Sequence, residues 1–460
     1  MTIDARPAHG KSVMVAVSMA LFCVQIDYFA MNLALPRMAS DFDSTATDLQ
    51  WIISIYMVTL GALMVPAGRL ADIFGRKRVL LIGITLFGLA SLLCAIAASV
   101  ATLVAFRALQ GVGAALIFPA SVSVITNAFP PAQSGRMIGL AYGIAGLGNA
   151  AGPLIGGLLT QTVGWRWIFA LNIPLAAACV LIGAFAISES RDTEAPRRID
   201  VAGLALLTAG IGVFTLTFDR ASVWGWWSLA TAGALTGAIA LLALFVVVER
   251  RVRWPLVDLS LARNMRFTVL VAAGSIANVA YGVTIFLSTV YLQDARGLDP
   301  LAAGLVFLGP SAGAAAGGVL SGRLAAGPPV RVMGVATILA AASLGLLAAA
   351  RDWALYVPTL TACGFTLGLV YAFTTVATQA VVSPQRAGEA AGIALTVMIV
   401  MGGVGVAVAS TMLERLRSTG MSTAGGIDVI FAILAAALLP AGLLVVAVAS
   451  RTADPASERC

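Results

Sequence analysis

The chain has 460 residues, of which 60% are apolar and only 11% are charged. A soluble protein of this length needs more charge to cover its surface, so the composition indicates an integral membrane protein. We attribute the net charge of +7 to basic residues in short cytoplasmic loops and expect no nucleic-acid partner. The single histidine, His9, and the spacing of the five cysteines argue against an enzyme or a metal site.

The apolar runs predict fourteen transmembrane helices, because about 20 mainly apolar residues are needed to cross the hydrocarbon core. The first six lie near residues 12–35, 48–67, 79–98, 101–127, 135–159 and 166–187. Two more lie near 201–218 and 227–248, and six follow near 267–292, 301–321, 330–350, 353–380, 385–413 and 427–449. We expect an all-α protein with an N-terminal six-helix bundle (1–187), a linker with two additional transmembrane helices (188–266), and a C-terminal six-helix bundle with a cytoplasmic tail (267–460).

The distribution of Arg and Lys predicts the orientation of these spans. With the N-terminus inside, 20 of the 28 Arg and Lys residues fall on the cytoplasmic side. We therefore expect a multi-pass protein of the cell membrane with both termini in the cytoplasm.

The polar stretch between the second and third spans, Gly68–Arg78, reads GRLADIFGRKR. Its composition predicts a tight loop in water, in which glycines permit a turn and Arg76–Arg78 follow the positive-inside rule. Topology does not explain Asp72, an acid in a loop that favours positive charge. GRLA recurs at Gly322–Ala325, after the second span of the last six, which indicates two related halves as in many transporters.

Several motifs resemble the major facilitator superfamily, and specifically its branch of fourteen-span drug:proton antiporters. Gly68–Arg78 resembles the superfamily's signature loop, and Leu103–Gly113 (LVAFRALQGVG) resembles its fourth-span motif. Asp27–Pro36 (DYFAMNLALP) and Trp165–Pro174 (WRWIFALNIP) resemble the fourteen-span branch. A fifth-span antiporter motif is matched by Gly148, Gly152, Pro153, Gly156 and Gly157. The resemblance implies two six-helix bundles that export drugs by alternating access, driven by the proton gradient without a cofactor.

Asp27 is the leading candidate for proton coupling. An ionisable side chain in an apolar span is costly and therefore marks a functional site by default. A carboxyl with little access to water can take up and release protons near neutral pH, although a structural ion pair would explain it too. Arg107 either extends to the extracellular interface or faces the cavity near Asp27. Resemblance to the antiporters favours the second position.

The resemblance implies that Asp72 contacts a helix start in the other half when the cytoplasmic side is closed. Ser383 and Pro384 offer such a start, because they are a capping residue and a first-turn proline whose positive helix end suits a carboxylate. We hypothesise a conformational latch. Its predicted residues are Gly68, Arg69, Asp72, Gly75, Arg76, Lys77 and Arg78.

The glycines of the fifth-span motif repeat every four residues, so close helix packing explains them physically, and a bendable seam uses the same features. A substrate cavity needs polar and aromatic groups in an apolar wall. Its candidates are Gln25, Asn32, Tyr56, Gln110, Asn149, Asn278, Tyr281, Tyr371 and Gln379. Each of these could equally form an interhelical hydrogen bond.

The leading functional prediction is a monomeric, proton-coupled antiporter that exports hydrophobic, cationic or neutral small molecules such as drugs, which would make it an antibiotic-resistance protein. A dedicated exporter of a single metabolite or antibiotic would share every motif named above. A membrane sensor that transports nothing is a third reading, against which Asp27 and the complete loop argue. We expect the lipid bilayer, protons and the small-molecule substrate to be its only partners.

Overall fold

A computed structural model describes residues 7–31, 34–44, 46–192, 200–253, 255–257, 259–298, 300–325, 327–350 and 352–450. Every regular element in these ranges is a helix, which confirms the all-α class. Asn32, residues 193–199 of the predicted linker and residues 451–460 of the predicted tail lie outside the described residues.

Fourteen helices of the described chain are long and apolar enough to cross a membrane, as the sequence predicts. The first eight are α1 (Pro7–Met31), α3 (Ala46–Phe74), α4 (Arg76–Ala95), α5 (Val100–Ala128), α6 (Pro131–Thr162), α7 (Arg166–Ala186), α8 (Val201–Trp224) and α9 (Leu229–Glu249). The last six are α11 (Met265–Val290), α12 (Pro300–Leu324), α13 (Pro329–Ala349), α14 (Trp353–Ala380), α15 (Ala387–Ser418) and α16 (Thr423–Ser450). Four short helices accompany them, namely α2 (Leu35–Asp41), α10 (Ser260–Arg263), a π-helical turn (Tyr291–Ala295) and a 3₁₀ turn (Pro384–Arg386).

The helices form two compact units. The first comprises Met1–Met137, Leu147–Leu259 and Ser383–Thr396. The second comprises Ile138–Gly146, Ser260–Val382 and Val397–Cys460. The boundaries fall inside α6 and α15, so both helices contribute residues to both units, and the start of α15 belongs with the N-terminal helices.

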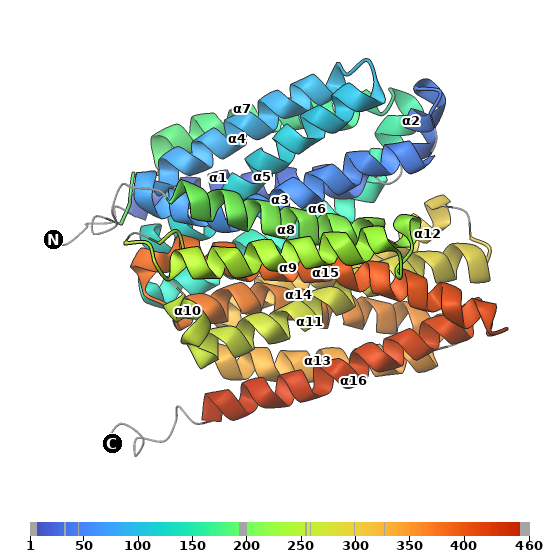
Figure 1. The fold of residues 1–460 in the computed structure, drawn as a ribbon. Helices are drawn as coiled ribbons and strands as arrows, with labels where there is room; N and C mark the ends of the chain where they lie inside the picture. The colour runs from blue at the N-terminus through green and yellow to red at the C-terminus, as the bar shows by residue number, and fades with distance from the viewer. Residues whose placement is uncertain are drawn as a thin grey trace. The chain divides into compact units, whose positions relative to one another are not determined.

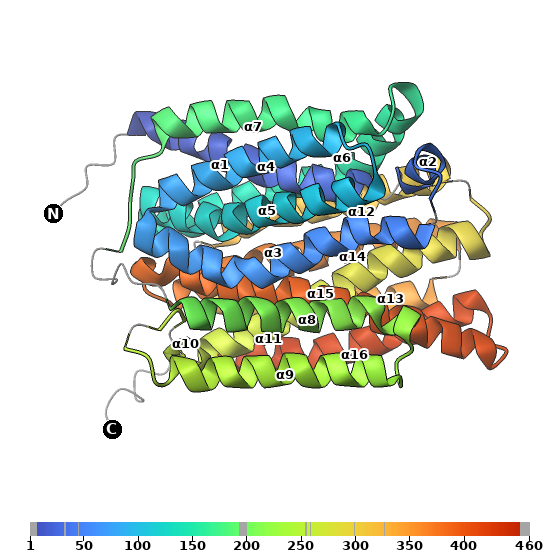
Figure 2. The same cartoon turned by 45° about the horizontal axis from the view of Figure 1, so that its top comes forward.

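Within the first unit, α4 packs against α5 and α7, and α3 packs against α5, as Figure 2 shows. α1 packs against α7 and α5, and α8 lies between α3 and α9 (Figure 1). Polar side chains on α1, α3, α4, α5 and α7 can therefore meet in the interior of this unit.

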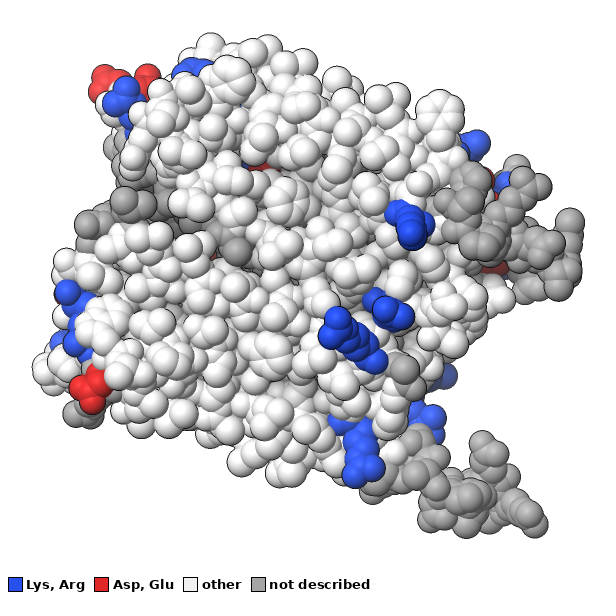
Figure 3. Space-filling model, turned by 180° about the vertical axis from the view of Figure 1, so that it is seen from behind, with Lys and Arg blue, Asp and Glu red and all other residues white. Residues whose placement is uncertain are grey.

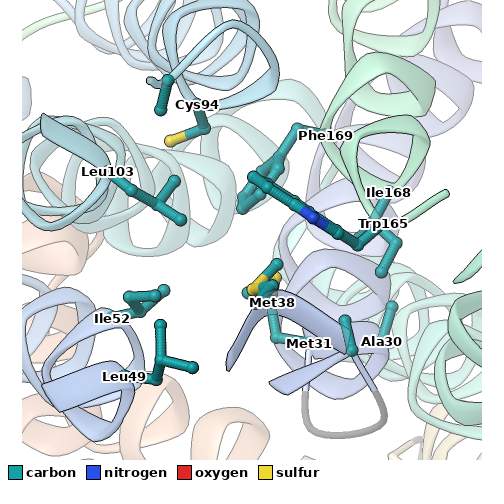
Figure 4. Packing of buried hydrophobic residues seen from close by; sticks show 12 residues of the cluster. Ala30, Met31, Met38, Leu49, Ile52, Cys94, Leu103, Trp165, Ile168 and Phe169 are labelled. Atoms are coloured by element: carbon teal, nitrogen blue, oxygen red, sulfur yellow. The ribbon is translucent and has the colours of Figure 1, made fainter. Parts of the chain in front are cut away.

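A hydrophobic cluster fills the first unit where α1 ends and α3, α5 and α7 begin (Figure 4). Trp165 and Phe169 pack edge to face at its centre, with ring centroids 6.1 Å apart. The cluster also contains Ile52 and Leu103, each one turn before a residue of the polar site described below. Because apolar side chains close this end of the helices, water has no open path along it to the polar interior.

The second unit is built mainly on α14, which packs against α11, α12 and α13, and on α16, which packs against α13 and α11. Large apolar side chains point outward in both units; Phe185 on α7 is 85% exposed, as suits a surface that faces lipid. Charged side chains are sparse in the broad middle of the face drawn in Figure 3 and lie mostly towards its two ends. This distribution is typical of a protein that spans a bilayer.

Candidate functional site

The carboxylate of Asp27 on α1 is enclosed by side chains from two other helices. Arg107 Nη1 on α5 donates to Asp27 Oδ2 over 2.6 Å. Gln110 Nε2 and Asn172 Nδ2 both donate to Asp27 Oδ1, over 3.0 and 2.8 Å. Asp27 is 1% exposed and Arg107 is fully buried. The structure therefore places Arg107 against Asp27, which is the second of the two positions left open by the sequence.

Arg107 is held on its other sides as well. Its Nη1 donates to Gln110 Oε1 over 2.6 Å, and its Nε donates to the carbonyl oxygen of Ile52 on α3 over 3.1 Å. The guanidinium carbon lies 4.2 Å from the ring centroid of Tyr56, a cation–π contact. Gln110 Nε2 also donates to Ser91 Oγ on α4 over 2.8 Å. One ion pair thus joins five helices of the first unit.

This arrangement suits a carboxyl that changes its protonation state. Buried charges are tolerated only when they are paired and hydrogen-bonded, and Asp27 satisfies both conditions. Among the described residues, Arg107 Nη2, Tyr56 Oη and Asn172 Oδ1 are buried without a hydrogen-bond partner in the protein. Polar atoms of this kind usually bind water, so the carboxylate is surrounded by groups that can carry a water molecule.

A second buried Asp–Arg pair lies at the other end of α3. Arg76 Nε and Nη2 donate to Asp72 Oδ1 over 3.0 and 2.9 Å. Arg76 Nη2 also donates to the carbonyl oxygens of Pro384 and Gln385, and Asp72 Oδ2 accepts the backbone N–H of Glu389 over 3.0 Å. Asp72 therefore meets the first turn of α15, whose N–H groups favour a carboxylate.

The structure differs from the sequence prediction for Gly68–Arg78 in two ways. The predicted loop in water is helical except at Gly75, whose φ of 117° needs glycine, and Asp72 and Arg76 are buried. The two charges compensate each other, and backbone groups satisfy their remaining hydrogen bonds, so neither needs water. Ser383 makes no side-chain capping bond, so Asp72 provides the acceptor that was expected from it.

The motif glycines of α6 bring this helix against α1 beside Asp27. A Cβ atom on Gly152 would lie 2.6 Å from Phe29 Cβ, and one on Gly156 would lie 2.7 Å from Ala30 Cα. A Cβ on Gly148 would lie 2.9 Å from the carbonyl oxygen of Phe22. Close packing accounts for these three positions, whereas a bendable seam stays a prediction; Pro153 and Gly157 lie in the same helix.

The predicted cavity residues do not gather at one place. Tyr56 and Gln110 belong to the Asp27 cluster, and Gln25 and Asn149 are half-buried on α1 and α6 of the same unit. In the second unit, Asn278 donates to the Met398 carbonyl over 2.7 Å, and Tyr371 packs edge to face against Tyr142. Tyr281 and Gln379 are half-buried there. A cavity of about 530 Å³ in the same unit is lined by Asn264, Met265, Arg266, Ala380, Val381 and Val382, and by none of the predicted residues.

Sequence reasoning missed three residues of these two sites. Ser91 and Asn172 complete the Asp27 cluster, and Glu189 accepts the backbone N–H groups of Lys77 and Arg78, both over 3.1 Å, at the start of α4. Asn172 was detectable, because it is an amide in an otherwise apolar span. Ser91 and Glu189 carry no comparable signal, since a serine is common in spans and Glu189 follows α7 in a polar stretch.

Comparison with known proteins decides the family. The Major Facilitator Superfamily matches residues 17–406. The chain belongs to this superfamily. It is therefore a multi-pass membrane transporter and not an enzyme, as the sequence predicts.

Three relatives of the chain have names that state a function. The Tetracenomycin C resistance and export protein of Streptomyces glaucescens is 32% identical, over 87% of this chain and 75% of the relative. The Multidrug resistance protein Stp of Mycobacterium tuberculosis (strain CDC 1551 / Oshkosh) is 33% identical, over 88% and 76%. The Puromycin resistance protein pur8 of Streptomyces alboniger is 33% identical, over 89% and 82%.

A solved structure shares the fold. The crystal structure of the human organic anion transporter MFSD10 (TETRAN) superposes with a TM-score of 0.70 at 14% identity, over 96% of this chain and 100% of that chain. At this identity the similarity supports the fold alone. The fourteen-span major facilitator fold predicted from the sequence is confirmed.

Proposed function

We propose that this protein exports hydrophobic small molecules, including antibiotics, from the cell in exchange for protons. The export of drugs rests on the relatives, which are named for resistance to tetracenomycin C, puromycin and multiple drugs. Exchange for protons rests on a single observation, the fully buried Asp27 carboxylate paired with Arg107 inside the spans. An ionisable group in that position is expected to serve transport.

Asp27 accepts a proton and then no longer attracts the Arg107 guanidinium as an anion. Arg107 can then turn to Gln110 Oε1 and the Ile52 carbonyl, which it already contacts over 2.6 and 3.1 Å. Loss of the proton restores the pair. Each protonation state thus favours its own arrangement of α1, α5 and α3, which is the two-state element that coupled transport requires.

The pair of Asp72 and Arg76 serves as a latch in this proposal. It joins the end of α3 to the start of α15 and must break when the cytoplasmic side opens. We place both termini in the cytoplasm, because most Arg and Lys residues then lie inside. Two six-helix bundles with two additional central helices, acting as a monomer, complete the proposal.

Export of one dedicated antibiotic is the second candidate, because two of the relatives are named for a single compound. A panel of compounds distinguishes the two functions. The purified protein in proteoliposomes is given an imposed pH gradient, and substrate movement and proton flux are recorded for lipophilic cations, neutral drugs and polyketide antibiotics. Flux with several classes supports a multidrug exporter, and flux with one class supports the dedicated exporter.

Asp27→Asn tests the role of the carboxyl in the same assay. Proton-driven export should be lost while facilitated exchange of substrate persists, since an amide cannot carry the proton. Asp294→Asn is the matched control, because Asp294 forms an exposed ion pair with Arg417 over 3.2 Å. Full proton-driven export by Asp27→Asn would remove Asp27 from the mechanism, and proton flux with no compound at all in the unaltered protein would favour the sensor.

A further inference from the structure

α8 carries a buried polar cluster that the proposed function does not use. Ser54 Oγ on α3 donates to Asp219 Oδ1 on α8 over 2.8 Å, and Arg220 Nε lies 3.3 Å from Asp219 Oδ2. The Arg220 guanidinium carbon lies 3.5 Å from the ring centroid of Trp51. Arg220 is 3% exposed and Ser54 4%. A buried guanidinium in a membrane helix is expensive, so this contact between α8 and α3 requires an explanation.

The two ion pairs, Asp27–Arg107 and Asp219–Arg220, contact opposite faces of the same two turns of α3. Residues of a helix are separated by about 100° each. Ile52 and Tyr56, four residues apart, therefore share the face that meets Arg107. Trp51 and Ser54, three residues apart, share the face that meets α8. The turns of α3 from Trp51 to Tyr56 are thus held between Arg107 on one side and Asp219–Arg220 on the other.

We infer that Asp219 and Arg220 are positioning residues for the Asp27–Arg107 pair, and that α8 supports the proton site through α3. The inference rests on the proposed function only in taking Asp27 as the proton carrier. Arg107 reaches α3 through a backbone carbonyl and an aromatic face, and both move with the helix itself. A shift of α3 away from α5 therefore weakens two of the contacts that orient Arg107 towards Asp27. The additional helix α8 then contributes to coupling although it provides no side chain to the Asp27 cluster.

Loosening α3 should change how readily Asp27 takes up a proton. The charged and titratable groups that interact with Asp27 or Arg107 are Cys23, Tyr28, Tyr56 and Cys94, in addition to Asp27 and Arg107 themselves. Arg107 is the only cation in this set. A carboxylate whose guanidinium partner is less well oriented binds a proton more readily, so protonation should occur at higher pH.

Ser54→Ala tests the inference with a small change that leaves the fold intact. It removes one hydroxyl and with it the hydrogen bond to Asp219. We expect the pH of half-maximal export to rise by about half a unit to one unit, which corresponds to a contact of about 1 kcal/mol. Asp219→Asn should act in the same direction. Ser54→Thr keeps a hydroxyl and should restore the original pH profile, and Asp294→Asn should leave that profile unchanged.

A measurement without transport separates this inference from the proposed function. The infrared carbonyl band of the protonated Asp27 carboxyl, identified by its loss in Asp27→Asn, is followed against pH in detergent. A rise in the midpoint of this band in Ser54→Ala, reversed in Ser54→Thr, supports the positioning role even if no proton-coupled export is found. An unchanged midpoint in both Ser54→Ala and Asp219→Asn overturns it, even if export proves to be proton-driven.

Discussion

The first unit contains two buried Asp–Arg pairs that use the same chemistry in different surroundings. Asp27 and Arg107 come from different helices, and the other donors to Asp27 are the amides of Gln110 and Asn172. Asp72 and Arg76 are four residues apart, and their further partners are backbone groups of residues 384–389. The first carboxylate is thus held by side chains alone, and the second by one side chain and one backbone N–H.

This difference separates a proton carrier from a latch. Side-chain amides and a guanidinium can rotate as a carboxylate becomes neutral, so their hydrogen bonds can rearrange within one packed core. A backbone N–H at a helix start moves only with its helix. Breaking the Asp72 contact therefore requires the start of α15 to move, whereas breaking the Asp27 contact requires only side chains to move.

The largest effect is expected from removing Arg107. Arg107→Ala leaves the Asp27 carboxylate buried without its cation, so the free energy of unfolding should fall by about 3–5 kcal/mol and export should be lost. Thermal unfolding in detergent and the proteoliposome assay measure both. The double variant Asp27→Asn with Arg107→Ala should regain much of the lost stability, because no charge then remains buried. A double variant no more stable than Arg107→Ala would show that the pair is not the source of the loss.

Asp72→Asn should slow export about tenfold or more, because an amide oxygen can still accept the Glu389 N–H but cannot form the ion pair with Arg76. Binding of substrate to the detergent-solubilised protein should change much less than the export rate. Arg78→Gln, which removes an exposed charge from the same stretch, is the control. Equal export rates in Asp72→Asn and the unaltered protein would end the latch hypothesis.

The sequence predicted the chemically costly members of both sites. Asp27, Arg107 and Asp72 stood out because an ionisable group in a span, or an acid in a basic loop, has no ordinary explanation. Gln110 was proposed only as a cavity residue, and Asn172, Ser91 and Glu189 were not proposed, since neutral polar side chains and a terminal acid have many roles. The burial of Arg76 could not be predicted, because it depends on carbonyl groups more than 300 positions away along the chain.

Gly156→Ala probes the packing beside the first pair. The added Cβ would lie 2.7 Å from Ala30 Cα, so α6 must shift from α1, and the free energy of unfolding should fall by about 1–3 kcal/mol. Gly237→Ala on α9 has no neighbour within 4 Å of its added Cβ and should be neutral or slightly stabilising. Thermal unfolding compares them. Equal midpoints would mean that α6 and α1 can separate without cost.

The smallest effect concerns the segment beside the second pair. Glu189→Gln weakens the acceptor for the first N–H groups of α4 and should reduce stability by about 1 kcal/mol. Export should be nearly unchanged, because neither Asp72 nor Arg76 loses a partner. Glu414→Gln, an exposed acid on α15, is the control for charge alone. A large loss of export in Glu189→Gln would extend the latch to the segment after α7.

The contacts of residues 189–192 determine where this transporter can be divided into two separately expressed fragments. Besides Glu189, the Ser190 carbonyl accepts the Arg76 N–H over 2.9 Å, and the Asp192 N–H donates to the Asp72 carbonyl over 2.8 Å. A fragment that stops with α7 at Ala186 would leave the turn between α3 and α4 without these partners. A complementation experiment should therefore place the break after Asp192, and a break at residue 187 should yield a pair of fragments that reassemble poorly.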